Sequence, residues 1–269
     1  MIKRERKDTH GVVLSVPNSL NNATTTQLRN NLIGAGNWIN QPNYKKQFKK
    51  NDTKNALDSM SDTCIFCQQK LTVATGREDA RSVEHFRPKS KYWWLAYSWD
   101  NLFPVCIACN RAKDDEFECN GTIITNIRSG DLVNIHTLAA DYQAIEQSKF
   151  LHPELDIPED HLKYDLNGSI ENNNSPRGEY TIATCKLDRL DLRGKRKSVF
   201  DTFDEKVSLI LFDGSKSKAE KQNEILKAYF DFQADTQIDR NEFSGYKRYV
   251  FKFYFRDVIN EYLSKINIL

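Results

Sequence analysis

Two cysteine pairs with C-x-x-C spacing constrain this chain more than any other feature of its sequence. Cys64 and Cys67 form the first pair, and Cys106 and Cys109 form the second. A two-residue spacing lets both thiolates of a pair reach one metal ion, and four thiolates complete a tetrahedral shell. The pattern therefore predicts one structural zinc ion, Zn(Cys)₄, that joins two distant segments of the chain.

The insert between the two pairs is 38 residues long, which is more than a simple zinc ribbon has. It carries Glu84 and His85 side by side, on a segment that we expect to be a strand. A histidine with a pKa near 6.5 is able to take a proton from water at physiological pH, so His85 is a candidate general base. A lone histidine is more often structural, and the assignment depends on its place between the cysteine pairs.

The order of these residues resembles that of HNH endonucleases of the ββα-metal class, in their zinc-supported form. Within that class, residues 83–102 are most similar to HNH subunits of two kinds of bacterial anti-phage system, the Septu and the retron-associated systems. The close resemblance covers residues 64–113, and one position departs from it, because Asn110 stands where the third signature residue is usually histidine. The matching residues are the two cysteine pairs, Glu84, His85, Asn101, Asn110 and Lys113.

The resemblance implies a role for each of four residues. His85 is the base that activates a water molecule, while Glu84 and Asn110 hold one Mg²⁺ or Mn²⁺ ion. Asn101 braces the loop and orients the histidine. Two oxygen ligands suffice for Mg²⁺, which keeps several waters and takes phosphate oxygens from the substrate. A different assignment stays open for Asn110, which would then only cap the following helix.

Basic residues around the motif are candidates for binding nucleic-acid phosphates, although solvated surface charge is an alternative for each of them. Residues 1–60 carry ten Lys/Arg against four Asp/Glu, and we expect their lysine run to contact phosphates rather than to be an ordinary solvated helix face. Five aromatic residues between 92 and 99 are able to stack on bases, but they are more often the core of so small a unit. The candidates for phosphate contact are Arg87, Lys89, Lys91, Arg111 and Lys113 near the motif, and Lys45, Lys46, Lys49 and Lys50 in the run.

We expect an α+β fold, in which a mostly helical body carries the zinc-stapled ββα unit. Residues 71–73 and 82–86 have the β-branched and aromatic content of a hairpin. Residues 163–170 predict a second hairpin with Asn167 and Gly168 at its turn. The expected divisions are a basic helical arm over 1–60, the nuclease unit over 61–120 and a mostly helical region over 121–269. Helices are predicted over 24–33, 43–60, 106–116, 137–150, 180–192, 195–212, 218–232 and 246–263.

The expected cellular compartment follows from two features that the sequence does not show, a membrane span and a signal peptide. No apolar run approaches the roughly 18 residues that a membrane span needs, and the charged N-terminus does not read as a signal peptide. We therefore expect a cytoplasmic protein with reduced thiols that are able to bind metal, and no membrane contact. Cys119 and Cys185 lie outside the paired pattern and are expected to be small buried hydrophobes.

The sequence thus predicts a metal-dependent endonuclease that hydrolyses nucleic-acid phosphodiester bonds, with DNA and RNA both open as substrates. The resemblance further implies an ATPase partner in a defence complex. Two alternatives belong to other classes of protein. One is a zinc-containing nucleic-acid-binding module whose active site is inactive. The asparagine at position 110, in place of the usual histidine, leaves this alternative open. The other is an interaction subunit that works mainly through its helical C-terminal half.

Overall fold

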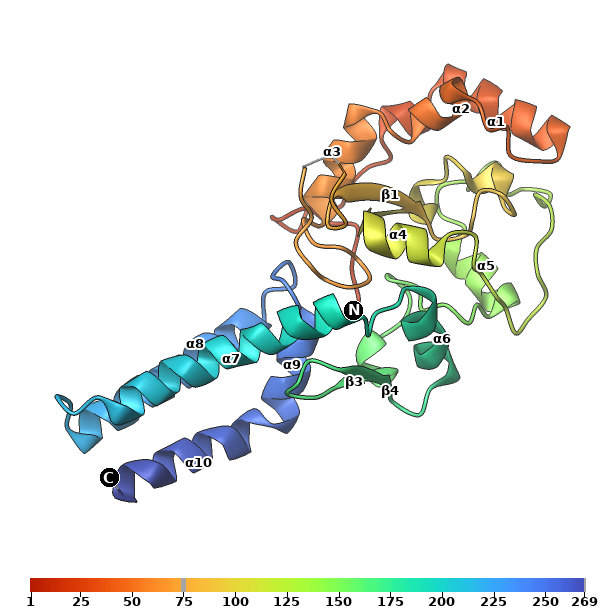
Figure 1. Cartoon of the computed structure of the whole chain (residues 1–269). Coiled ribbons are helices and arrows are strands. Elements are labelled where there is room, and N and C mark those ends of the chain that lie inside the picture. The colour runs from red at the N-terminus through yellow and green to blue at the C-terminus, as the bar shows by residue number, and fades with distance from the viewer. Residues whose placement is uncertain (74–75, 269) are drawn as a thin grey trace.

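The computed structural model describes residues 1–73 and 76–268, and Figure 1 shows the path of the chain. It has the predicted α+β class, with two small two-stranded antiparallel sheets among the helices. The helices and strands are α1 (Ala23–Ala35), α2 (Pro42–Gln47), α3 (Asn51–Met60), β1 (Arg81–His85), β2 (Leu102–Cys106), α4 (Ile107–Lys113), α5 (Ala139–Glu146), β3 (Leu162–Tyr164), β4 (Ile170–Asn172), α6 (Pro176–Thr184), α7 (Leu190–Phe212), α8 (Lys218–Thr236), α9 (Ser244–Phe253) and α10 (Phe255–Ile268).

Strands β1 and β2 and helix α4 form a ββα unit, but the predicted pairing of its strands is wrong. Strand β1 pairs with β2, with His85 opposite Leu102 and Arg81 opposite Cys106. The expected partner segment, 71–73, makes only an isolated parallel bridge between Thr72 and Ala80. Strand β2 is buried at every residue, so it lacks the alternation that marks a half-exposed strand. It also contains a proline, which argues against a strand when sequence is the only guide.

The predicted second hairpin is confirmed, and its turn needs glycine. Strands β3 and β4 pair with Tyr164 opposite Ile170, and Gly168 has φ +79°. A Cβ atom at this position would also lie 2.3 Å from the carbonyl oxygen of Arg193. Both the left-handed backbone and the close approach of α7 therefore exclude a larger residue.

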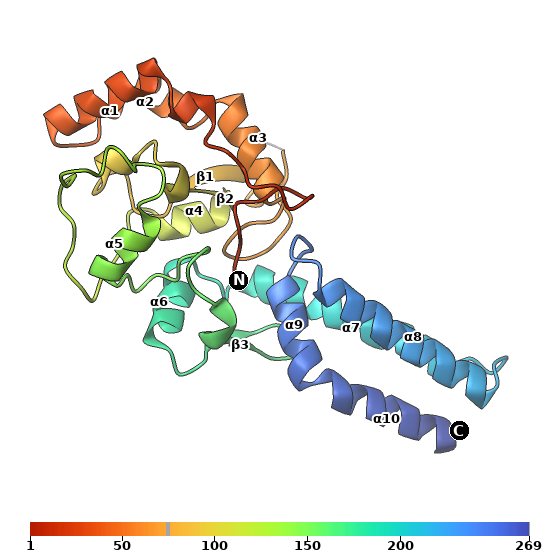
Figure 2. The same cartoon turned by 180° about the vertical axis from the view of Figure 1, so that it is seen from behind.

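Three of the predicted helices are interrupted. The 43–60 segment is broken into α2 and α3, and the 246–263 segment is broken at Tyr254 into α9 and α10. The 180–192 helix is misplaced: the Ser175 side chain caps α6 by accepting a hydrogen bond from the Gly178 N–H, and α7 starts only at Leu190. Helices α7, α8 and α10 extend together away from the rest of the molecule, as both views show (Figures 1 and 2).

Two hydrophobic clusters hold the described residues together. The larger one joins the ββα unit to the C-terminal helices. The smaller one seats α1, α2 and α3 on the loop between β1 and β2, through residues such as Phe48, Tyr97 and Trp99. Four of the five loop aromatics are buried, as the core interpretation predicts, and Trp93 is half-buried. Within residues 1–73 and 76–268, no helix combines the length and the apolar character that a membrane span needs.

Candidate active site and metal centre

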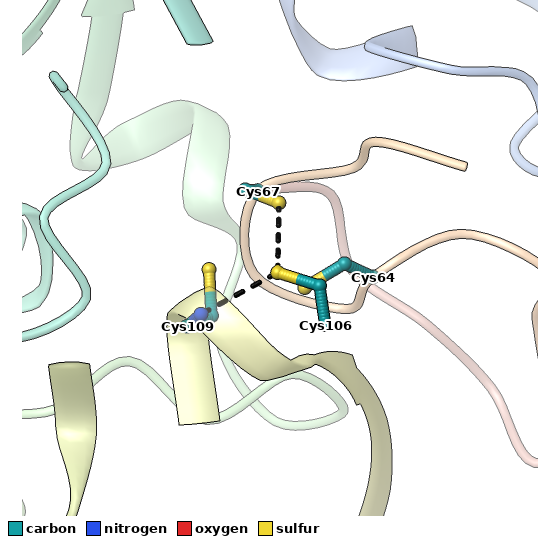
Figure 3. Close-up of side chains that lie close together, drawn as sticks. All are labelled: Cys64, Cys67, Cys106 and Cys109. Atoms are coloured by element: carbon teal, nitrogen blue, oxygen red, sulfur yellow. Dashed lines mark hydrogen bonds between the residues drawn. The ribbon is translucent and has the colours of Figure 1, made fainter. Parts of the chain in front are cut away.

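The four paired cysteines converge at one end of the β1–β2 sheet. Cys64 and Cys67 lie on a loop after α3, while Cys106 ends β2 and Cys109 lies in the first turn of α4 (Figure 3). All four sulfur atoms lie within 4.8 Å of one another, and the residues are buried. The Sγ atoms of Cys67 and Cys106 are 3.7 Å apart. Tetrahedral zinc with Zn–S bonds of 2.3 Å requires a sulfur–sulfur distance of roughly 3.8 Å.

The chemistry of this donor set fits zinc. Burial raises the pKa of the Cys64 thiol, so the buried cluster needs a cation before its thiols ionise together. Cys106 already accepts a hydrogen bond from the Cys109 N–H, and the Arg189 guanidinium lies 3.7 Å from the Cys109 sulfur. Cys119 and Cys185 are outside the cluster, as the sequence predicts; Cys185 is buried and Cys119 is half-buried.

His85 ends β1, at the opposite end of the sheet from the cysteines. Its ring is 5% exposed and packs edge-on against Phe48, with 4.6 Å between ring centroids. Nε2 lies 3.0 Å from the carbonyl oxygen of Ala96, which accepts only if Nε2 carries the proton. That hydrogen bond leaves Nδ1 as the unprotonated nitrogen. Burial, aided by the ammonium of Lys89, lowers the pKa of His85 to about 3, so the ring is neutral at physiological pH.

Asn101 makes the loop brace that the resemblance implies. Its Oδ1 accepts from the Arg87 N–H at 2.8 Å, and its Nδ2 donates to the Arg87 carbonyl at 3.0 Å. The same amide nitrogen lies 3.3 Å from the carbonyl oxygen of Leu95, the residue before Ala96. The brace therefore fixes the backbone that holds His85.

Glu84 is buried beside His85 and already has a cationic partner. The ammonium of Lys113, which is fully buried, lies 2.7 Å from Glu84 Oε1 and donates to the His85 carbonyl at 3.1 Å. Burial raises the pKa of Glu84 while Lys113 opposes that rise. The predicted cation ligand Glu84 is thus present in the site, but its negative charge is already paired with the ammonium of Lys113.

Asn110 lies inside α4, and the helix-cap alternative for it is wrong. The N-cap of α4 is Cys106. The Asn110 side chain instead reaches β1, where Nδ2 donates to Ser82 Oγ at 2.6 Å and lies 3.4 Å from the Val83 carbonyl oxygen. No hydrogen bond to Oδ1 is present among the described residues. The amide is therefore oriented with its nitrogen on the strand and its oxygen available as a ligand.

The candidate phosphate-binding residues separate into two groups. Arg87 is 2% exposed and pairs with Glu146 at 2.7 Å, and Lys113 is buried against Glu84, so neither reaches the surface where a phosphate would lie. These two are corrected to buried ion-pair residues. Lys89 is half-buried, and Lys91 and Arg111 are exposed.

A pocket of about 220 Å³ collects the predicted residues and adds others that the motif did not reveal. His85, Glu84 and Asn110 all line it. Two lysines of the predicted basic run also line it, and two acidic residues follow α4. The added residues are Lys45, Phe48, Lys49, Ser82, Asp114 and Asp115. The basic run carried the signal for the lysines, whereas nothing in the spacing of the motif identified the two aspartates.

Comparison with known proteins finds similarity over the same stretch of the chain. Residues 64–116 match the family model described as HNH endonuclease. The match spans both cysteine pairs and the whole ββα unit, so this stretch is similar to HNH endonucleases.

The similarity extends beyond the HNH domain. The chain is 28% identical over 213 residues to Septu protein PtuB of Bacillus mycoides (strain KBAB4), which covers 72% of this chain and 63% of PtuB. It is 30% identical over 154 residues to Septu protein PtuA of the same strain, which covers 52% of this chain and 19% of PtuA. The chain is therefore homologous to both proteins and aligns with less than two thirds of the length of either. The predicted resemblance to HNH and Septu proteins is confirmed.

Proposed function

We propose that this chain is a metal-dependent endonuclease that hydrolyses phosphodiester bonds of nucleic acid. The observation that supports it best is the setting of His85. The imidazole is neutral, is tethered through Nε2 to Ala96, and lines one pocket together with Glu84 and Asn110. A neutral, oriented imidazole beside two oxygen ligands is the arrangement that a base needs to activate water.

The chain's own residues have distinct tasks in this reaction. His85 Nδ1 takes a proton from the attacking water, because Nε2 is committed to the Ala96 carbonyl. Glu84 and Asn110 would hold a Mg²⁺ or Mn²⁺ ion, since hard cations prefer carboxylate and amide oxygens. Such a cation, when bound, stabilises the negative charge that develops on the phosphate. Lys45 and Lys49 line the pocket and attract the polyanionic substrate.

The biological setting is part of the same proposal. The chain acts as the nuclease of a cytoplasmic anti-phage complex, together with an ATPase partner. Similarity to the Septu proteins PtuB and PtuA supports this role. Because fold and family do not by themselves fix a biological role, the partner needs its own test by co-purification.

A second candidate is a zinc-containing nucleic-acid-binding or interaction subunit that does not cleave. One observation favours it: Glu84 already pairs with the buried ammonium of Lys113. In addition, Asn110 stands where the usual signature has a more basic histidine. Both features weaken the hold on a catalytic cation.

The test compares wild type with His85→Ala in the full chain, with its partner present. Cleavage of plasmid and tRNA is followed across a Mg²⁺ and Mn²⁺ series. Loss of a general base costs about 10² to 10⁴ in rate, so His85→Ala should bind nucleic acid normally and cleave it poorly. His10→Ala is the matched control, since His10 is exposed and remote in the sequence. Binding without cleavage by wild type would select the second candidate, and Asn110→His should then restore activity.

A further inference from the structure

A second and larger pocket, of about 510 Å³, adjoins the pocket of His85. It lies between α3 and β1, and Lys49, Ser82 and Val83 line both pockets. We propose that this second pocket binds the nucleotide next to the scissile phosphate on the substrate strand. The proposal rests on the nuclease function proposed above and adds the place where the neighbouring nucleotide lies.

The floor of the second pocket suits a nucleobase. Leu57 of α3, Val83 of β1, Pro104 of β2 and Ile107 of α4 all line it. Binding sites for small organic groups typically have volumes of roughly 300–1,000 Å³ and mostly apolar walls with a few polar groups. The pocket is in this range and its floor is apolar, so a flat base with limited hydrogen bonding is able to fill it.

The rim of the pocket is cationic. Lys49 and Lys54 both line it, and neither forms an ion pair with any residue in the described parts of the chain. Arg81 and Asp58 also line the pocket and pair with each other, so the two lysines leave the lining with a net positive charge. Two lysines without acidic partners lie beside an apolar floor. This arrangement suits a nucleotide, whose nucleobase is largely apolar and whose phosphate is negatively charged.

The backbone at the junction adds a hydrogen-bond donor. The Phe86 N–H donates to the Asn101 carbonyl at 2.9 Å, and hydrogen-bonded pairs alternate along an antiparallel ladder. Val83, opposite Pro104, is therefore a residue whose backbone groups point away from β2. Its carbonyl oxygen faces the Asn110 amide at 3.4 Å, which agrees with that orientation. The Val83 N–H is thus on the side of β1 away from β2, and Val83 and Lys49 both line the two pockets, so the proposed phosphate between two nucleotides would lie there.

A nucleotide fits this site better than a strand of a partner protein, which would be the other occupant of a free strand edge. A protein strand needs a run of free backbone groups. Here the Arg81 N–H is already taken by the Thr72 carbonyl at 3.0 Å, and the Val83 carbonyl faces Asn110. The continuity with the pocket of His85 further favours the substrate itself.

The first experiment measures the charge at the rim. The full chain carries His85→Ala so that the oligonucleotide stays intact, and Lys54→Gln is compared with Lys227→Gln, a matched exposed lysine on α8. The slope of log K against log salt should become shallower by about 0.7 on single strands for Lys54→Gln. Lys227→Gln should leave the slope unchanged. Equal slopes for both variants would overturn the proposed phosphate contact.

The second experiment tests the base. A short oligonucleotide is compared with the same backbone lacking its bases, and the intact one should bind about tenfold more tightly. Ile107→Trp fills the pocket and should abolish that preference while the backbone-only binding stays. Zinc content and circular dichroism establish that the variant is folded. If it does not fold, photo-crosslinking of a 4-thiothymidine oligonucleotide to His85→Ala replaces it, and crosslinks should fall on residues 54–57 and 104–107.

The outcomes separate this proposal from the function on which it rests. Cleavage by wild type with no effect of Lys54→Gln or Ile107→Trp, and crosslinks elsewhere, would refute the pocket and keep the nuclease. No binding of any nucleic acid would refute both. Retained nucleic-acid binding with loss of a protein partner in Ile107→Trp would assign the pocket to that partner instead.

Discussion

The two ends of the β1–β2 sheet carry two different sets of candidate metal ligands within one small unit. At the Cys106 end, four buried thiols close around a single point. At the His85 end, a carboxylate, an amide and an imidazole line an accessible pocket with lysines around it. Structural zinc sites are closed by four protein ligands, whereas catalytic sites leave positions for water and substrate. We therefore expect the cysteine end to provide stability, and the proposed function places the chemistry at the His85 end.

Helix α4 connects the two ends, so the pocket at the His85 end depends on the cysteine end and not the reverse. Cys109 is in its first turn, Asn110 follows directly, and Lys113 is its last residue. A helix of this length has little stability by itself, so the cysteine end has to hold it in place. Losing the zinc site should therefore also disorganise the pocket, while changes in the pocket should leave zinc bound.

The largest effect is expected from the cysteines. Structural zinc contributes roughly 10–16 kcal/mol in small domains, which is comparable with the whole free energy of unfolding of a domain. Cys64→Ser or Cys109→Ser should give insoluble or zinc-free protein, and Cys119→Ser and Cys185→Ser should keep their zinc. Elemental analysis of purified protein measures the difference. Full zinc occupancy in Cys109→Ser would contradict the assignment.

The buried ion pair at the other end should give the next largest effect. Lys113→Met leaves the Glu84 carboxylate buried without its partner, and breaking such a pair costs about 3–5 kcal/mol of unfolding free energy. Adding Glu84→Gln removes the uncompensated charge and should recover most of the loss. Arg111→Met is the control, because Arg111 is exposed and its surface pair with Glu78 is worth at most about 1 kcal/mol.

Urea unfolding in the presence of zinc measures these changes, and zinc content should stay full in all three variants. A Lys113→Met protein as stable as wild type would mean that Glu84 is not held by this lysine. In that case the carboxylate would be free for a cation at no cost to the fold.

Lys113 also shows where sequence reasoning stops. The motif located His85, Glu84 and Asn110, which all line the pocket, since spacing to the cysteines fixes their order along the chain. The motif could not show that Lys113 points inward. A lysine in the last turn of a helix has the same sequence pattern whether its side chain is buried or solvated. Arg87 was misjudged for the same reason: its partner, Glu146, is 59 residues away in sequence.

The strand pairing failed for a related physical reason. Secondary structure that depends on local pattern was mostly predicted, including the hairpin over 163–170 with its Asn-Gly turn. Strand β2 depends instead on a partner across a long loop, and its burial on both faces erased the period of two. The Ser82 hydroxyl that orients Asn110 was equally invisible, because it requires the register of β1 against α4.

The core between the two ends gives a smaller, pH-dependent effect. His152 is fully buried against the rings of Phe86 and Phe103, and burial lowers its pKa well below the usual value. The fold therefore favours the neutral ring, so its stability is present above about pH 6.5 and is lost as the pH falls below that value. Each proton taken up on unfolding changes stability by about 1.4 kcal/mol per pH unit.

His152→Asn should remove this dependence, because an amide oxygen is able to accept the Glu154 N–H that Nδ1 now accepts at 3.2 Å. The difference in unfolding free energy between wild type and variant is measured at several pH values, which cancels the pH dependence of zinc binding. It should shift in favour of His152→Asn as the pH falls from 7 to 5. A constant difference would show that folding does not lower the pKa of His152, because the folded and unfolded chains would then take up the same number of protons.

The smallest expected effect is on the salt dependence of binding, and it should distinguish two lysines of the run from the other two. Lys45 and Lys49 line the pocket of His85, whereas Lys46 and Lys50 do not line it. Each lysine that neutralises a phosphate contributes about 0.9 to the salt slope on duplex DNA and about 0.7 on single strands. Lys45→Gln with Lys49→Gln should therefore flatten the slope by nearly two such steps, and Lys46→Gln with Lys50→Gln should barely change it. Binding is measured in the His85→Ala background over a range of salt concentrations. Equal slopes for the two double variants would mean that the run acts only as diffuse charge, because diffuse attraction depends on the number of lysines and not on which of them face the pocket.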